Sequence, residues 1–220
     1  MNLPVLLLLI AAILPALSGC VPAVAVGATT AAFVISDRRQ PEAFLADEGI
    51  ELRASNRINE KFPEKVHVNV TSYNRMALLT GEVPDEATSR EIEKIVSTVP
   101  MVKTIINELQ VSGLSSLAGR ATDAFLTSKI KARFLDHNQF SPTKVKVVTE
   151  AGTAFLIGIV TNAEATTSVD IARTTGGVLK VVRVFDIISD EEARRLDGTK
   201  PPPPSIPASL STKISTPAAQ

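Results

Sequence analysis

The sequence contains few of the residues that most often carry catalytic or metal-binding chemistry. Its 220 residues include one cysteine, two histidines, one tyrosine and no tryptophan. The single cysteine excludes a disulfide within the chain, and His67 and His137 lack the close spacing of zinc-binding motifs. A glycine-rich phosphate loop and a Gly-x-Ser-x-Gly nucleophile motif are also absent. We therefore expect no catalytic residue, no metal site and no cofactor, and predict that the protein is not an enzyme.

One long apolar run is present, at the N-terminus. Residues 1–19 carry no charged side chain, and residues 3–13 are almost entirely apolar. This length is typical of a signal-peptide core and too short for a helix that spans a bilayer. The run is followed by Leu17, Ser18, Gly19 and Cys20. This order resembles the bacterial lipobox, in which a peptidase cleaves just before a cysteine that carries a diacylglycerol.

The lipobox resemblance implies a lipoprotein signal peptide over residues 1–19 and a lipid anchor on Cys20. In lipoproteins of this kind an aspartate after the cysteine favours retention in the inner membrane, whereas Val21 stands there in this sequence. The resemblance therefore implies an outer-membrane protein that is lipid-anchored and faces the periplasm. Each acyl methylene buried in a bilayer contributes about 0.8 kcal/mol, so two or three chains would hold the protein firmly. The alternative interpretation of Cys20 is a small buried hydrophobic residue.

Two segments are expected to lie outside any folded core. Residues 20–46, in which Cys20 is followed mainly by valine, alanine, glycine and threonine, are expected to form a lipidated linker. Residues 198–220 contain four consecutive prolines and predict a disordered, partly polyproline tail. Just before the tail, Ser189 and Glu192 have the spacing of a capping box, which predicts a short helix over residues 189–197.

The region between these ends repeats itself with a step of about 77 residues. Apolar residues and a glycine recur at matching positions, and an acidic residue near the start of each copy recurs with a step of 76. The matching pairs are Asp47 with Asp123, Val68 with Val145, Val70 with Val147, Gly81 with Gly158, and Val83 with Val160. The repeat predicts two modules of one fold, at residues 47–112 and 122–188, joined by a linker at residues 113–121.

Within each copy the hydrophobic spacing changes in the same order. In the first copy, apolar residues four positions apart from residue 50 to 58 predict a helix, and alternation from residue 66 to 70 predicts a strand. A second strand, a helix capped by Asp85 and a closing strand follow. The second helix can cross over, right-handed, to a strand parallel to its neighbour. We predict an α+β fold of two α-β-β-α-β modules, each a three-stranded mixed sheet covered on one face by two helices.

Both copies resemble the BON domain. The resemblance rests on a Leu-x-Gly-x-Val turn, at residues 79–83 and 156–160, and on the closing strand, where Val184 replaces the asparagine that stands at Asn107. Together with the lipobox, the two modules resemble outer-membrane lipoproteins of the DolP/YraP type over about residues 17–188. The resemblance implies binding to anionic phospholipid through the first helix of the second module, and support of envelope integrity.

The two modules differ in charge. Residues 47–111 hold eight basic and eleven acidic side chains, whereas residues 120–185 hold nine basic and five acidic ones. The zero net charge of the whole chain therefore conceals an acidic first module and a basic second module. This difference favours the second module as the one that meets an anionic surface.

The first helix of the second module carries a candidate binding face. Phe125 is not part of the predicted core, and its counterpart in the first module is Gly49. An exposed aromatic ring beside basic side chains is typical of a membrane interface. The candidate phospholipid-binding residues share one helical face by their spacing: Phe125, Ser128, Lys129, Ala132 and Arg133.

Three alternatives remain open at this point. Phe125 could pack on the other module or under the linker at residues 113–119, with the basic residues merely solvating a helix face. The protein could instead be a periplasmic adaptor that binds an envelope-assembly or peptidoglycan-hydrolase partner, with Phe125 anchoring that interface. A protective periplasmic stress protein without lipid selectivity is the third. No feature of the sequence indicates a nucleic-acid partner.

Overall fold

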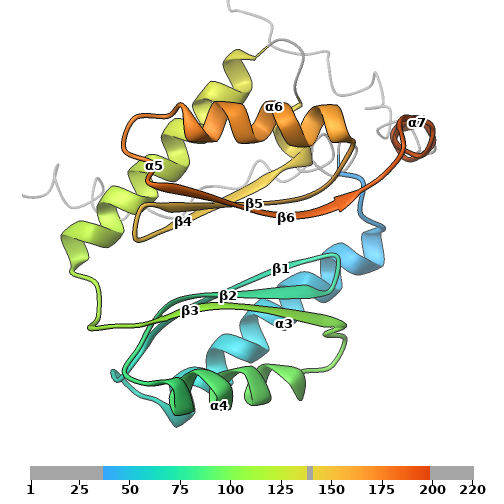
Figure 1. The fold of residues 1–220 in the computed structure, drawn as a ribbon. Helices are drawn as coiled ribbons and strands as arrows, with labels where there is room; N and C mark the ends of the chain where they lie inside the picture. The colour runs from blue at the N-terminus through green and yellow to red at the C-terminus, as the bar shows by residue number, and fades with distance from the viewer. Residues whose placement is uncertain (1–36, 138–140, 199–220) are drawn as a thin grey trace, which may run out of the picture. The chain divides into compact units, whose positions relative to one another are not determined.

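The computed structural model describes residues 37–137 and 141–198, which fall in one compact unit. The predicted signal peptide, Cys20, most of the predicted linker and the proline-rich residues 199–220 lie outside the described residues. The first module contains α3 (Pro41–Lys61), β1 (His67–Tyr73), β2 (Met76–Val83), α4 (Glu86–Ser97) and β3 (Thr104–Val111) (Figure 1). The second contains α5 (Leu117–Asp136), η1 (Pro142–Lys144), β4 (Lys146–Glu150), β5 (Thr153–Val160), α6 (Asn162–Arg173) and β6 (Lys180–Ile187), and α7 (Asp190–Gly198) follows.

Each module has the predicted topology. The sheet orders are β1-β2-β3 and β4-β5-β6, with the first pair of strands antiparallel and the second pair parallel. Asp85 caps α4 as expected, because its side chain accepts the Thr88 backbone N–H. The α+β fold of two α-β-β-α-β modules is thereby confirmed.

Both first helices begin earlier than the sequence suggested. α3 begins at Pro41, inside the segment expected to be linker, because proline is well suited to the first helical position. α5 begins at Leu117, inside the expected linker at residues 113–121, because the Ser116 side chain caps it by accepting the Gly119 N–H. The linkers are therefore shorter than predicted, and α5 gains more than one turn at its N-terminus.

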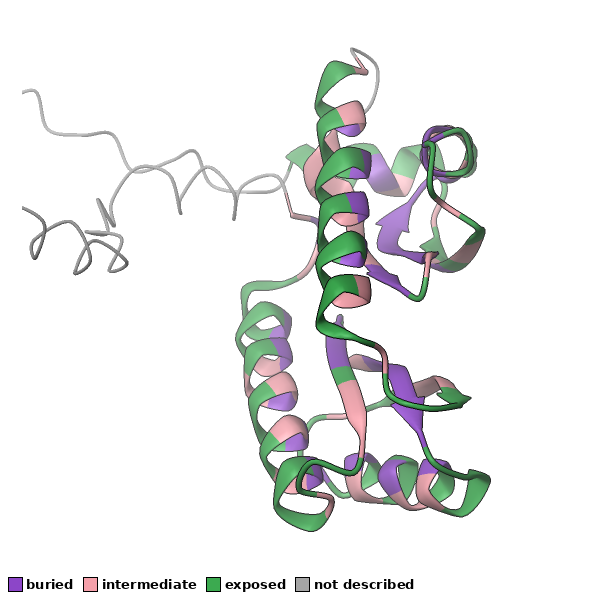
Figure 2. Ribbon diagram, turned by 90° about the vertical axis from the view of Figure 1, so that its left-hand side faces the viewer, coloured by how far each residue is buried: buried purple, intermediate pink, exposed green. Residues whose placement is uncertain are grey.

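The helices of each module cover one face of its own sheet. In the first module, Ile50 and Ile58 of α3 and Ile92 of α4 bury against Leu79 and Val83 of β2. In the second, the equivalent core is formed by Ile130, Phe134, Leu156, Val160 and Ala172. Burial therefore follows a stripe along one side of each helix, as the colours of Figure 2 show for α5.

The other face of each sheet contributes to a cluster that both modules share. Tyr73 and Leu78 from the first module pack with Phe155, Ile157 and Val184 from the second. Side chains alternate along a strand, so Leu78 contacts the other module while Leu79 contacts the helices of its own. Every residue of β5 is buried for this reason. The two modules are therefore joined sheet face to sheet face.

A carboxylate organises the hairpin of each module. Asp47, 2% exposed, accepts the backbone N–H groups of Asn74 and Arg75 at 2.8 and 2.7 Å. Asp123 accepts those of Ala151 and Gly152 at 3.0 and 2.9 Å. All four turn residues have positive φ, so the acceptor satisfies N–H groups that the turn directs away from the ladder. The repeated acidic residue is explained by this structural role.

The Leu-x-Gly-x-Val motifs lie within β2 and β5 and do not form turns, and the glycine of each permits a close approach of neighbouring backbone. Gly81 has φ +114°, and an added Cβ would lie 2.0 Å from the His67 carbonyl oxygen. At Gly158 the added Cβ would lie 2.3 Å from the Lys144 carbonyl oxygen. Both oxygens belong to backbone, which cannot move aside cheaply.

We predict that Gly158→Ala lowers the free energy of unfolding by about 2–3 kcal/mol, because backbone must shift to admit the methyl group. Urea unfolding of the purified chain measures this loss. Gly113→Ala is the matched control, since a Cβ there meets no atom within 4 Å, and it should stay within about 0.5 kcal/mol of the parent. Equal losses at the two positions would contradict the assignment.

A buried arginine joins the start of the described chain to its end. Arg38, 4% exposed, donates to Glu164 at 2.6 Å, to Asp197 at 2.9 Å and to the Ile159 carbonyl at 3.0 Å. Burial alone would lower the pKa of Arg38 and raise that of Glu164, but their hydrogen bonds reverse both directions. The hydrogen bond from Arg38 also lowers the pKa of Asp197. The segment before α3 is thereby fixed to α6 and α7.

We predict that Arg38→Met costs about 2 kcal/mol at pH 7, because it leaves Glu164 partly buried without its main partner. The pKa values of Glu164 and Asp197 are lowered on folding, so the stabilisation is complete above the unfolded pKa, near 4, and is lost as pH falls through the folded pKa. The difference in free energy of unfolding between parent and variant, measured by urea unfolding, should become smaller below pH 4. Arg173→Met, which removes an exposed pair with Asp170, should cost far less; a similar cost would contradict the prediction.

Candidate functional site

The outward face of α5 carries a continuous stripe of apolar and small side chains. They are spaced by four, four, three, four and three residues, which places them on one side of a helix. All are exposed, including Leu117 at 81%, Phe125 at 65% and Leu135 at 69%. Figure 2 shows α5 with one buried side and an exposed side opposite it. The members of this α5 stripe are Leu117, Ala121, Phe125, Ser128, Ala132 and Leu135.

The α5 stripe is less polar than its composition suggests. Ser128 donates its hydroxyl proton to the Ala124 carbonyl at 3.0 Å, within the helix. The core residues Leu126, Ile130 and Phe134 occupy the opposite side, so α5 is apolar on two faces. A single exposed apolar side chain needs no explanation, whereas a contiguous exposed row is typical of a binding surface.

The two basic residues of the predicted face lie on the flank of α5 that faces α6. Lys129 donates to the Gly176 carbonyl at 2.9 Å. Arg133 donates to the Ile171 carbonyl and to the Thr175 hydroxyl, both at 2.7 Å. These acceptors are neutral, so the two positive charges are positioned and not cancelled. Both residues therefore also brace α5 against the end of α6, which the sequence did not indicate.

The other flank of the α5 stripe is also basic. Lys131 is exposed and makes no hydrogen bond or ion pair with the residues that the structure describes. Arg120 is half-buried and donates to Ser115 Oγ at 3.0 Å. The acidic residues of α5 are Asp123, whose carboxylate is occupied by the hairpin, and Asp136 in the last turn. The stripe is thus bordered by positive charge on both sides.

Sequence reasoning missed Leu117, Ala121 and Leu135. The first two were assigned to a linker, because the cap at Ser116 was not identified. Leu135 was overlooked because it follows Phe134, which ends the core stripe. Counting four and eight residues back from Phe125, which is the spacing of residues on one face of a helix, would have found Ala121 and Leu117.

The equivalent face of α3 differs in its centre and its C-terminal half. Leu45 and Leu52 are exposed there at 72% and 64%. Gly49 stands in the place of Phe125, and Asn56 and Asn59 stand in the places of Ala132 and Leu135. The continuous apolar row is therefore a property of the second module.

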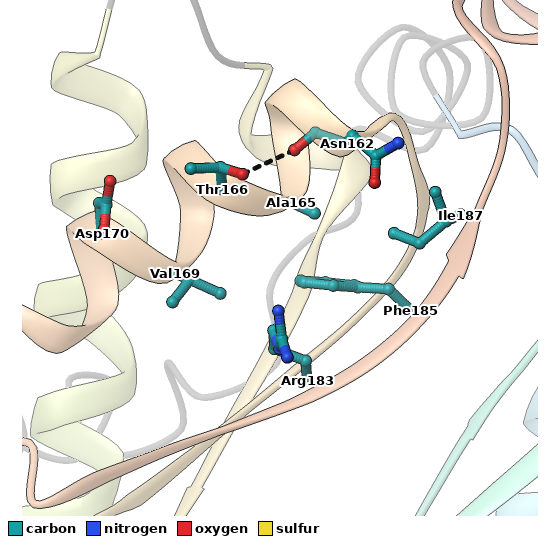
Figure 3. Close-up of a pocket in the computed structure, with 8 residues that line it drawn as sticks. All are labelled: Asn162, Ala165, Thr166, Val169, Asp170, Arg183, Phe185 and Ile187. Carbon is teal, nitrogen blue, oxygen red and sulfur yellow. Dashed lines mark hydrogen bonds between the residues drawn. The ribbon is translucent and has the colours of Figure 1, made fainter.

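A groove of about 460 Å³ lies between α6 and β6 (Figure 3). Val169, Phe185 and Ile187 give it an apolar floor, and Arg183 and Asp170 lie on its border. Asp170 is already paired with Arg173 at 2.7 Å. The groove brings together no nucleophile and base, and it lies on another element than the candidate site residues.

A second group of polar side chains meets where the two modules join. His67 Nδ1 lies 3.0 Å from Glu82 Oε2 and 3.6 Å from Glu150 Oε1. Glu82 and Glu150 are 3% and 4% exposed. Burial raises the pKa of Glu150 even though Asn69 donates a hydrogen bond to it, and the charge of Glu82 adds to this rise. Residues this far apart in sequence give no metal-binding spacing, so the sequence did not reveal the group.

No helix among the described residues is both long and apolar enough to cross a bilayer. The family model of the BON domain matches residues 46–113 and 122–188. The chain belongs to the BON domain family. The α5 stripe lies on the first helix of the second BON domain. The group formed by His67, Glu82 and Glu150 lies where the first BON domain meets the second.

This tandem BON protein is similar to two curated proteins over most of its length. It is 36% identical over 171 residues to the outer membrane lipoprotein DolP of Haemophilus influenzae, covering 77% of this chain and 89% of that protein. It is 29% identical over 154 residues to a 21 kDa hemolysin of Actinobacillus pleuropneumoniae, covering 69% of this chain and 79% of that one. A structural match is found with CdsD, a structural protein of the type III secretion system of Chlamydia trachomatis. The match covers 70% of this chain and 98% of that chain, with a TM-score of 0.29 and 14% sequence identity. That score is too low to carry functional meaning.

Proposed function

We propose that this BON protein is a non-enzymatic outer-membrane lipoprotein, anchored through Cys20 and facing the periplasm, which binds anionic phospholipid through α5 and supports envelope integrity. The observation that carries the proposal is the α5 stripe, an exposed apolar row bordered by basic side chains. The similarity to a protein named as an outer membrane lipoprotein supports the location. Cys20 lies outside the described residues, so the lipobox supports the anchor from sequence alone.

The chemistry of the α5 stripe suits the boundary between headgroups and acyl chains. Phe125 and the leucines at each end of the stripe would enter the apolar side of that boundary, where burying a large side chain contributes about 1.5–3 kcal/mol. Lys129, Lys131 and Arg133 would remain at the headgroups, where each cation near an anionic surface contributes about 1 kcal/mol. Ser128 and Ala132 are small enough to let the helix lie close to the surface.

Lipid anchoring would make these modest contributions sufficient. An acylated Cys20 confines the modules near the membrane, which raises the effective concentration of lipid at α5. The acyl chains would supply most of the affinity, and the α5 stripe with its basic borders would supply selectivity for anionic lipid. The acidic first module would be disfavoured at the same surface.

We predict that Phe125→Ala weakens binding of the unlipidated chain to phosphatidylglycerol vesicles roughly tenfold, because it removes the largest side chain at the centre of the stripe. Vesicle co-sedimentation measures this change. Leu52→Ala is the matched control, since Leu52 is exposed to a similar degree on the equivalent face of α3, and binding should be unchanged. Unchanged binding of Phe125→Ala, or an equal loss with Leu52→Ala, would refute the α5 assignment.

Reversing one charge gives an independent prediction. Lys131→Glu should weaken binding to phosphatidylglycerol vesicles at least about fivefold in low salt, and much less at 0.5 M salt, because screening removes the electrostatic part. Lys131 serves better than Lys129, which holds the Gly176 carbonyl, because the substitution leaves the fold intact. An effect of the same size in high and low salt would argue against an anionic headgroup as the ligand.

The adaptor function remains the competing proposal, because the α5 stripe would also serve as a protein interface. Crosslinking from a photoreactive residue at position 121 in cells separates the two. Recovery of lipid adducts supports the membrane proposal, whereas recovery of one protein adduct without lipid supports the adaptor.

A further inference from the structure

The arrangement of His67, Glu82 and Glu150 has the dimensions of a metal site. Zinc binds imidazole nitrogen and carboxylate oxygen at about 2.0–2.2 Å, so two ligand atoms at tetrahedral positions lie about 3.4 Å apart. The distances from His67 Nδ1 to the two carboxylates, 3.0 and 3.6 Å, bracket this value. The three ligand atoms all lie within 4.8 Å of one another.

The strand register creates this meeting point. His67 and Glu82 are directly opposite each other in the β1–β2 pair, on the sheet face that packs against the second module. Glu150 ends β4, and Asn69 of β1 donates to its second oxygen at 2.6 Å. Two carboxylates from different modules are thereby buried around one imidazole.

The burial leaves a requirement for positive charge. Two carboxylates that are nine-tenths buried repel each other and are costly to ionise together unless a cation lies between them. Asp123 of α5 adds further negative potential at Glu150. Arg120 does not contact either carboxylate in this group directly; it donates to Ser115 Oγ, which in turn donates to Glu82. A metal ion at His67 Nδ1 would meet the requirement.

We propose that His67, Glu82 and Glu150 bind one zinc ion that joins the two BON modules. Nitrogen and oxygen donors in this number suit zinc, with a fourth position open to water. None of these three residues belongs to the α5 stripe. The proposal therefore goes beyond the lipid-binding function and does not depend on it.

Outer-shell hydrogen bonds already orient both carboxylates, as they do in metal sites. Asn69 holds Glu150, and Ser115 donates both its N–H, at 3.2 Å, and its hydroxyl, at 3.0 Å, to Glu82. Thr80 is a further buried polar residue on this face of the sheet. It is 1% exposed, and its hydroxyl has no hydrogen-bond partner among the described residues. It lies two residues from Glu82 on the same strand face and directly opposite Asn69.

A zinc ion here would hold the two modules together. Its ligands come from β1, β2 and β4, and Ser115, one residue before the cap of α5, is hydrogen-bonded to a ligand. Binding would therefore stabilise the folded chain and hold the start of α5, which carries the lipid-binding stripe. The role is structural, and no chemical step is assigned to the ion.

The test uses the full chain with Cys20→Ala, purified in detergent without a histidine tag and stripped with a chelator. We expect equilibrium dialysis against about 10 µM zinc to give one ion per chain. A hundredfold excess of zinc over its Kd should raise the Tm by about 5–10 °C. Circular dichroism of the metal-free variants checks that each remains folded.

Two ligand variants and two controls make the test specific. Glu150→Gln and His67→Gln should each lower zinc affinity at least tenfold and abolish the Tm shift. His137→Gln removes the other histidine of the sequence, and Glu48→Gln removes an exposed carboxylate of α3; both should bind zinc like the parent.

Less than one-tenth of an ion per chain under these conditions would overturn the proposal. Equal zinc binding by the parent, His67→Gln and Glu150→Gln would overturn it as well, by placing the ion elsewhere. Phe125→Ala should bind zinc normally, so failure of the lipid proposal and failure of the zinc proposal give different results.

Discussion

The packing of the two sheets against each other is the interaction on which the rest of the structure depends. A three-stranded sheet with helices on one face leaves its other face apolar, and a module of this size is only marginally stable by itself. Leu78 and Tyr73 on one side and Phe155 and Ile157 on the other bury those faces together. Since the sheets are used for this contact, the outward faces of the first helices are the surfaces left for other partners.

The same contact explains where the chain places its polar groups. At one edge of the shared cluster, His67 and Glu82 meet Glu150, and elsewhere Arg38 binds the Ile159 carbonyl and the carboxylates of Glu164 and Asp197. Both groups connect parts far apart in sequence across buried surroundings. Specific charged contacts therefore hold the two modules together in addition to apolar burial.

Much of the fold was predictable because each module is specified by local patterns. Three of these patterns act within one module: the spacing of Ile50, Ala54 and Ile58, the Leu-x-Gly-x-Val motif and the cap at Asp85. The repeat then supplied the second copy. The core stripe of α5 was complete without Phe125, which the sequence therefore left either exposed or packed on the other module or the linker, and the structure has it 65% exposed.

Contacts between segments far apart in sequence were not predictable. The hydrogen bonds of Lys129 and Arg133 to the end of α6 depend on how two helices pack, which no local pattern encodes. The meeting of His67 with Glu150 requires the relative placement of two modules, and the sequence left that open. The early start of α5 was missed for a different reason, since a single serine cap in a polar segment resembles ordinary loop sequence.

The central claim is that the α5 stripe enters the boundary of an anionic membrane. The chain has no tryptophan, so Phe125→Trp places a single indole at the centre of the stripe. If the account is right, phosphatidylglycerol vesicles will shift the indole emission to shorter wavelength, and lipids brominated near the headgroup end of the acyl chain will quench it more than lipids brominated near the tail. An emission spectrum that vesicles leave unchanged, with the protein bound to them, would contradict the claim.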